Sequence, residues 1–193
     1  MPEKSFLILE SNLTTADIKQ ITSQWDLDPS IFANPDSPVE IARFIPLNST
    51  VLVSGHLLVT FDLKKDAKSI EQELVPVFTI FDQDHLFIGS TTQVIEIDTD
   101  NLKIIFANLF NQLDHINQKL NTVKQKIDYL DSVARETTKT KELKKVTDLT
   151  RKLVYLKHTL DDQTESLRSF GKYLEKNQLA SSADIASLMT KQS

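Results

Sequence analysis

Cysteine is absent from the 193 residues, and glycine occurs at only three positions. Without cysteine there is neither a disulfide framework nor thiolate chemistry, which suits a reducing compartment. With so few glycines there is no phosphate-binding loop, and the G-x-S-x-G and H-E-x-x-H motifs do not occur either. The sequence offers no catalytic constellation, so we predict that the protein is not an enzyme.

Long apolar runs and an excess of basic residues are also missing. The longest uncharged stretch, 44–61, is interrupted by Pro46 and Gly55. It therefore predicts two strands and a turn rather than a membrane span, which needs about 20 apolar residues. The chain carries 22 basic and 27 acidic side chains, a net charge of −5, and acidic residues interrupt the lysine cluster at 139–145. We expect no nucleic acid partner, because phosphate binding needs a basic stripe.

The second half of the chain contains two long patterns of apolar residues spaced alternately by four and three. The first pattern is Leu102, Phe106, Leu109, Leu113, Ile116, Leu120, Val123, Ile127, Leu130 and Ala134. The second is Val146, Leu149, Leu153, Leu156, Leu160, Gln163, Leu167, Phe170 and Leu174. Such spacing is the seam of a helix that packs on another helix, and a short turn at 136–140 separates the two. We predict two antiparallel helices of more than 30 residues, each about 50–57 Å long. The polar Gln163 either fixes their register or lies beyond the end of the partner helix.

The first half of the chain has the pattern of a mixed α/β unit with five to seven strands. Thr14 and Asp17 mark a helix N-terminus, and 75–81 with 85–88 predicts a hairpin. A strand ends at Phe61, and the long helix opens at Asp98. Near the C-terminus, Ser181-x-x-Asp184 resembles a capping box. We therefore predict an α+β (α/β) fold. Its parts are a mixed-sheet domain at 1–97, a helical hairpin at 98–178 and the start of a further helix at 179–193.

Three groups of polar residues are candidates for binding a cation. His158 lies at helical spacing from Asp161 and Asp162, but a solvated helix face is the favoured interpretation. The sequence at 82–85 contains two aspartates and a histidine, and a polar hairpin turn explains it as well. Asp62 and Asp66 follow the strand that ends at Phe61 and read as a strand-to-loop exit.

This order of elements resembles the cytoplasmic portion of the CorA family of magnesium transporters. The stretches that carry the resemblance are Leu13–Asp17 with Trp25–Pro29, Val39–Phe44 with Leu57–Phe61, Val77–Phe81 with His85–Ile88, and Glu142–Leu160. Asp36-Ser37-Pro38 stands where the family has R-P-K, and the G-M-N tripeptide and both membrane helices do not occur in the sequence. The resemblance implies a soluble fragment that ends early in a stalk helix.

The resemblance further implies an ion-sensing domain on the cytoplasmic face of the cell membrane. Family members are pentamers, so it implies a homo-oligomer in the full-length protein, whereas the fragment is a monomer or dimer. Mg²⁺, with Co²⁺ as a second candidate, would bind weakly and bridge carboxylates of neighbouring subunits. By position the metal ligands are Asp62 and Asp184, with Asp66 as the substitute for Asp62, and we expect each carboxylate to be exposed. The alternative function is a free-standing coiled-coil adaptor that uses the hairpin for docking.

Overall fold

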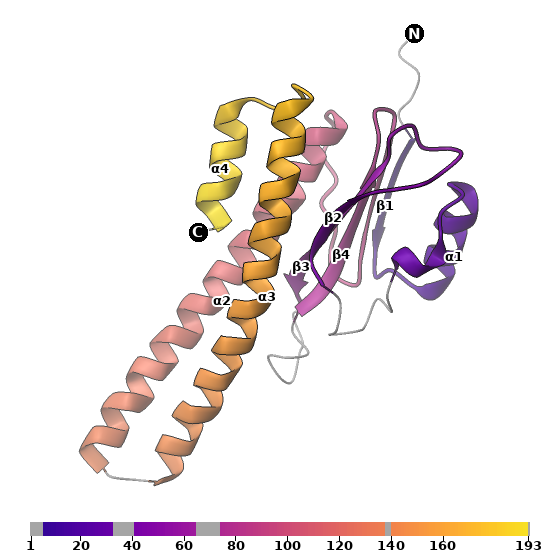
Figure 1. Ribbon diagram of the computed structural model, residues 1–193. Coiled ribbons are helices and arrows are strands. Elements are labelled where there is room, and N and C mark those ends of the chain that lie inside the picture. Colours follow the sequence, from indigo (N-terminus) through magenta and orange to yellow (C-terminus); the bar gives the residue numbers. More distant parts are fainter. Residues whose placement is uncertain (1–5, 33–40, 65–73, 138–139, 193) are drawn as a thin grey trace.

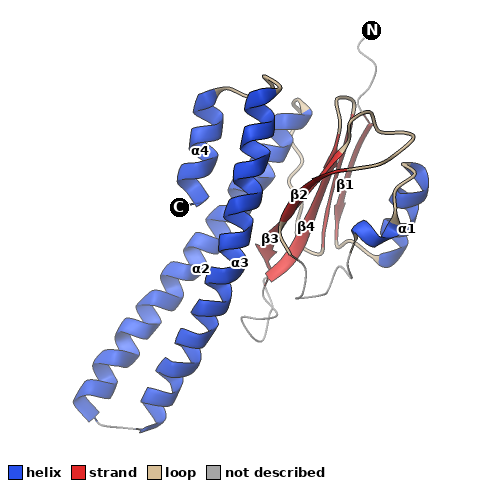
Figure 2. Ribbon diagram, viewed as in Figure 1, coloured by secondary structure: helices blue, strands red, loops and turns tan. Residues whose placement is uncertain are grey.

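The molecule has three layers, with one short helix on one side of a sheet and three helices on the other (Figure 1). The computed structural model describes residues 6–32, 41–64, 74–137 and 140–192. A sheet domain is followed by a helical hairpin that extends well beyond the sheet. The predicted α+β class is confirmed (Figure 2).

The sheet has five strands in the order β1-β5-β4-β3-β2. They are β1 (Phe6–Ser11), β2 (Arg43–Pro46), β3 (His56–Leu63), β4 (Leu74–Phe81) and β5 (His85–Ser90). β1 pairs with β5 in parallel, and the other neighbours are antiparallel. The predicted hairpin is the β4–β5 pair. β3 continues past the predicted end at Phe61 to Leu63, so Asp62 lies inside a strand.

The outer face of the sheet is covered by α1 (Thr15–Gln24) and the 3₁₀ turn η1 (Pro29–Ile31). The predicted helix start is confirmed, because Thr14 and Asp17 form a reciprocal capping box. Ile21 and Trp25 of this layer are 1–2% exposed. They pack on alternate residues of the central strands, among them Val59 and Phe78. Strand β4 has both faces covered and is buried along its whole length.

The inner face of the sheet carries α2 (Asn101–Thr137) and α3 (Thr140–Lys176), each 37 residues long. This confirms the predicted pair of long antiparallel helices. α2 begins at Asn101 rather than at Asp98, because Asp100 supplies the cap: its carboxylate accepts from Lys103 N and its carbonyl from Ile104 N. Among the described helices, none combines the length and apolar character needed to cross a membrane.

Helix α4 (Ser182–Gln192) folds back against α2 and α3. α3 ends in a Schellman motif, with Gln178 at φ 55° and hydrogen bonds from Leu179 N to Leu174 O and from Gln178 N to Glu175 O. The predicted capping box between Ser181 and Asp184 then starts α4. A Cβ atom on Gly171 would lie 3.2 Å from Ile185 Cγ2, so glycine there permits close packing of α3 and α4.

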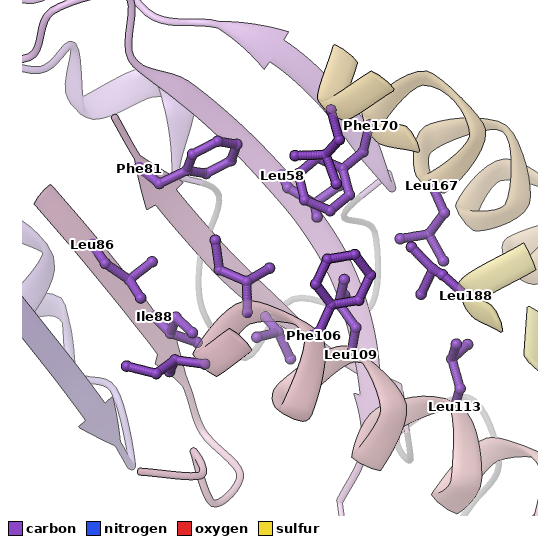
Figure 3. Packing of buried hydrophobic residues seen from close by; sticks show 14 of the residues in the cluster. Leu58, Phe81, Leu86, Ile88, Phe106, Leu109, Leu113, Leu167, Phe170 and Leu188 are labelled. Carbon is purple, nitrogen blue, oxygen red and sulfur yellow. The ribbon is translucent and has the colours of Figure 1, made fainter. Parts of the chain in front are cut away.

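The main core lies where the sheet, α2, α3 and α4 meet (Figure 3). Phe170 of α3 is fully buried between Phe81 of β4 and Phe106 of α2, with ring centroids 5.8 and 6.4 Å away. Leu188 of α4 is fully buried in the same cluster. The apolar side of the hairpin is therefore divided, since its first part packs on the sheet and its distal part on the partner helix.

His56 lies in an aromatic cluster at the edge of this core and gives the protein a pH-dependent stability. Its ring centroid is 4.3 Å from that of Tyr173 and 5.1 Å from that of Phe44. Burial lowers the pKa of His56 in the folded protein, and a hydrogen bond that its Nδ1 donates to the Ser54 carbonyl only partly offsets this. The unfolded chain then binds more protons below the ordinary histidine pKa of about 6.5, so stability falls as the pH is lowered through that value.

We expect the urea midpoint to be lower at pH 5.5 than at pH 7.5, with a smaller difference in His56→Gln, whose side chain does not titrate in this range. The same pH dependence in both proteins would assign the effect to another histidine.

Candidate functional site

Asp62 lies on β3 and faces the helical layer, where its side chain is 2% exposed. Its Oδ1 atom accepts a hydrogen bond from Leu63 N at 2.7 Å and lies 2.9 Å from Nδ1 of His115 on α2. Its Oδ2 atom accepts from Thr92 Oγ1 at 3.0 Å. The carboxylate therefore has partners on both oxygens, from the strand, the segment after β5 and helix α2.

The hydrogen-bond network continues beyond Asp62 into the sheet. Thr92 Oγ1 lies 3.0 Å from Ser90 Oγ, which donates to the Pro76 carbonyl of β4. His115 is 35% exposed at its side chain, and in the described part of the chain its Nε2 atom has no protein partner. A carboxylate that holds one imidazole nitrogen and leaves the other free can orient a proton carrier or a metal ligand.

The expectation that Asp62 is exposed is wrong. Because β3 continues to Leu63, the alternation of the strand points this side chain at α2 and not into solvent. An ion shared with a neighbouring subunit could reach this carboxylate only after some of its present hydrogen bonds had opened. The buried network explains Asp62 as a connection between the sheet and α2, and its proposed role as a metal ligand stays a prediction.

Asp184 is exposed, as expected, in the first turn of α4. Both hydrogen bonds from Ser181 end on its Oδ2 atom, at 2.6 Å from Oγ and 3.3 Å from N. The Oδ1 atom has no partner among the described residues and is available to a hydrated cation. Within one chain Asp184 does not share a hydrogen-bond partner with Asp62. The predicted pairing joins Asp62 of one subunit to Asp184 of its neighbour, so it is a property of an oligomer.

The remaining sequence candidates that the structure describes do not gather into a cluster of metal-ligating side chains. Asp66 lies outside the described residues. The described part of the chain contains no group of three His, Cys, Asp or Glu side chains placed to hold a metal ion. Asp161 pairs with Lys157 at 2.7 Å, which supports the interpretation of His158 and its neighbours as a solvated helix face.

Asp82 organises the β4–β5 turn. Its carboxylate accepts from the backbone N atoms of Val53, Asp84 and His85 at 2.7–2.9 Å. Burial acts to raise the pKa of Asp82, but these donors together with the His85 ring hold it below its ordinary value. The polar hairpin turn predicted from the sequence is therefore the interpretation that the geometry supports.

Two hollows flank α4 where it lies on α2. One, of about 1070 Å³, is lined by Phe110, Asn117, Leu120, Asn121, Ala183, Ala186, Ser187, Thr190 and Lys191. The other, of about 800 Å³, is lined on its polar side by Asp100, Lys103, Ser181 and Asp184. Lys191 attaches the C-terminal end of α4 to α2. Its Nζ atom forms an ion pair with Asp114 at 2.8 Å and lies 5.0 Å from the centroid of the Phe110 ring.

Sequence reasoning missed the polar residues that join the hairpin to the sheet. Gln163 is 1% exposed, and its Oε1 atom accepts from Phe61 N at 2.8 Å. It binds β3, a partner that neither proposed explanation of this polar seam position included. Thr60 Oγ1 donates to Gln112 Oε1 at 2.6 Å in the same layer. The only available signal was a polar residue in an apolar helical pattern, and that signal does not reveal the partner.

No family model matches the sequence and no curated protein does, but several solved structures resemble the chain. The ZntB cytoplasmic domain from Vibrio parahaemolyticus aligns at a TM-score of 0.73 and 8% identity, covering 96% of this chain and 77% of that one. The soluble domain of CorA from Methanocaldococcus jannaschii aligns at a TM-score of 0.65 and 11% identity, over 96% of this chain and 81% of that one. This chain has the fold of the CorA soluble domain.

The comparison confirms, at the level of the fold, the resemblance to the CorA family seen in the sequence. The complete CorA transporter from the same archaeon aligns at a TM-score of 0.64 over 96% of this chain, and the full-length CmaX protein at 0.63 over all of it. This chain spans 64% of the length of each of these two proteins. The alignments extend over nearly all of the 193 residues.

Proposed function

We propose that this chain is the ion-sensing regulatory domain of a CorA-like Mg²⁺ or Co²⁺ transporter, working as an oligomer at the cytoplasmic face of the membrane. One observation carries the proposal, namely a fold shared with transporter domains over 96% of the chain at TM-scores up to 0.73. A pentamer is the assembly that the family resemblance implies. The lack of a catalytic constellation in the sequence agrees with a regulatory role.

The proposed sensing depends on carboxylates that face a neighbouring copy. Mg²⁺ keeps several of its waters and needs only one or two carboxylates from each partner. Asp184 suits this because it is exposed and one of its oxygens has no described protein partner. Asp62 would join such a site only in a state in which His115 and Thr92 have released it. The two proposed ligands therefore differ in their accessibility to a cation, and Asp184 would bind first.

The test is the cation dependence of assembly, measured by sedimentation velocity on the purified 193-residue protein. Samples would run from chelator to millimolar Mg²⁺ or Co²⁺ at constant ionic strength. We expect divalent cations to shift the population toward oligomers and chelator to reverse the shift, because removing the ion leaves like charges facing each other. Binding to the monomer should be weak, since it supplies only part of the site.

Two substitutions at Asp184 separate cation binding from helix capping. Asp184→Lys places a fixed positive charge where the ion is proposed to bind, so this variant should assemble to a similar extent with and without Mg²⁺. Asp184→Asn keeps an oxygen that can accept from Ser181 but loses the negative charge, so it should lose the response to Mg²⁺. If assembly of the wild-type protein did not depend on divalent cations, the proposal would be contradicted. The alternative function, a coiled-coil adaptor that docks through the hairpin, would then be favoured.

A further inference from the structure

The charge of the protein is distributed very unevenly. Residues 119–157, the distal part of the hairpin, carry 11 basic and 5 acidic side chains, a net charge of +6. The rest of the chain carries 11 basic and 22 acidic side chains, a net charge of −11. We call residues 119–157 the basic tip. The overall charge of −5 hides this positive end on a negative molecule.

The basic side chains of α3 gather along one flank of the tip. Lys141, Lys144 and Lys145 are exposed, and Arg151 with Lys152 follows seven residues after the last two. Residues three, four and seven apart lie on the same side of an α-helix, so these five positions share one side of α3, with a single acidic residue, the exposed Asp148, among them. Positive charge that is concentrated in this way attracts a polyanion more strongly than the same charge scattered over a surface.

Apolar side chains are exposed among the charges of the tip. Tyr129 of α2 is 67% exposed, and Leu143, Val154 and Tyr155 of α3 are 52%, 51% and 37% exposed. Tyr155 lies three and four residues after Lys152 and Arg151, so its ring borders the basic stripe. Tyrosine and lysine side chains together suit a boundary between water and lipid, since both pair an apolar part with a polar end.

The type of basic residue distinguishes between classes of polyanion. Nine of the eleven basic residues in the tip are lysine, and one of the two arginines, Arg135, is already paired with Asp131 at 2.8 Å. Nucleic acid recognition favours arginine, whose planar group binds phosphates and bases with two hydrogen bonds at once. Lysine acts as a mobile point charge, which suits the diffuse negative potential of an anionic bilayer.

We propose that the basic tip binds the surface of a bilayer that contains anionic phospholipids. The acidic remainder of the molecule is repelled by the same surface, so the hairpin stands on the membrane with its tip down. This deepens the proposed function and rests on it for the location of the bilayer. α4 runs in the same direction as α2, with Lys191 bound to Asp114, and so points toward the tip. Membrane helices that followed α4 would enter the bilayer on the side that the tip faces.

Vesicle flotation in chelator tests the inference without any contribution from divalent cations. The probes are vesicles of phosphatidylcholine alone and of phosphatidylcholine mixed with phosphatidylserine. The tip variant replaces Lys141, Lys144, Lys145 and Lys152 with glutamine. The matched control replaces the exposed Lys19, Lys64, Lys172 and Lys176 with glutamine, which changes the net charge equally but outside the tip. Circular dichroism would establish that both variants are folded.

We expect wild type to bind only the anionic vesicles, more weakly as salt is raised. The tip variant should bind at least about tenfold more weakly than wild type. The control variant should bind as tightly as wild type. Equal binding to neutral vesicles, equal losses in both variants, or no binding to anionic vesicles would each overturn the inference. Tighter binding to duplex DNA or to single-stranded RNA would also overturn it. These results are independent of cation-dependent assembly in solution, so either proposal can fail while the other holds.

Discussion

Replacing Phe170 with alanine is expected to lower the free energy of unfolding by about 3–5 kcal/mol. The side chain is fully buried where the sheet, α2 and α3 meet, with Phe44 as a further neighbour at a centroid distance of 5.5 Å. Truncation removes apolar surface from the core and leaves a cavity that rigid strands on one side cannot fill. The loss would be a large fraction of the total stability of a domain of this size.

Urea unfolding followed by circular dichroism at 222 nm measures this loss, and Tyr129→Ala is the matched control. Tyr129 is also an aromatic residue in the long hairpin, but it is 67% exposed, so its truncation should change the free energy by less than about 0.5 kcal/mol. A loss at Phe170 as small as that at Tyr129 would mean that α3 does not pack on the sheet as described.

Replacing Asp62 with alanine is expected to destabilise the fold by about 2–3 kcal/mol in the absence of any divalent cation. The substitution removes the acceptor of Thr92 Oγ1 and Leu63 N, and it leaves His115 Nδ1 without its carboxylate partner. Buried donors that lose their partner keep the cost of their desolvation, whereas the partly exposed His115 can return to water. The effect should therefore fall below that of a fully buried ion pair.

A double-mutant cycle with His115→Ala, measured in chelator, tests the origin of this loss. Coupling of about 1 kcal/mol or more between the two positions would show that Asp62 joins the sheet to α2 without an ion. If Asp62→Ala were neutral in chelator but destabilising in Mg²⁺, the buried network would not be its main role. Asp62 would then be chiefly a metal ligand, as the family resemblance implies.

The hairpin could be predicted from the sequence because its signal is local and repeated. Alternating spacings of four and three over more than 30 residues specify a packed helix whatever the neighbours are. The capping residues Thr14 and Ser181 were readable for the same reason, since their partners lie three residues away. The β4–β5 hairpin followed from two apolar strands joined by a short polar turn.

The surroundings of Asp62 could not be predicted, because its partners lie far away in the chain. His115 is 53 residues further on and Thr92 is 30, and both are brought to β3 by the way α2 and the segment after β5 lie on the sheet. The two extra residues at the end of β3 also decide which way Asp62 points, since side chains alternate between faces. The parallel placement of β1 beside β5 is likewise a long-range choice that no local pattern indicates.

The division of α2 between two environments means that its two ends open independently of each other. Ile104, Ile105 and Leu109 are 1–2% exposed in the main core, whereas Leu120 and Ile127 are only partly buried at the edge of a second, smaller cluster, where the hairpin leaves the sheet. We expect backbone amides near Leu109 to exchange with solvent deuterium only when the whole domain unfolds. Amides near the far end of α2, where the hairpin extends beyond the sheet, should exchange whenever the two helices briefly separate, with the sheet intact. One continuous helix thus belongs to two cooperative folding units.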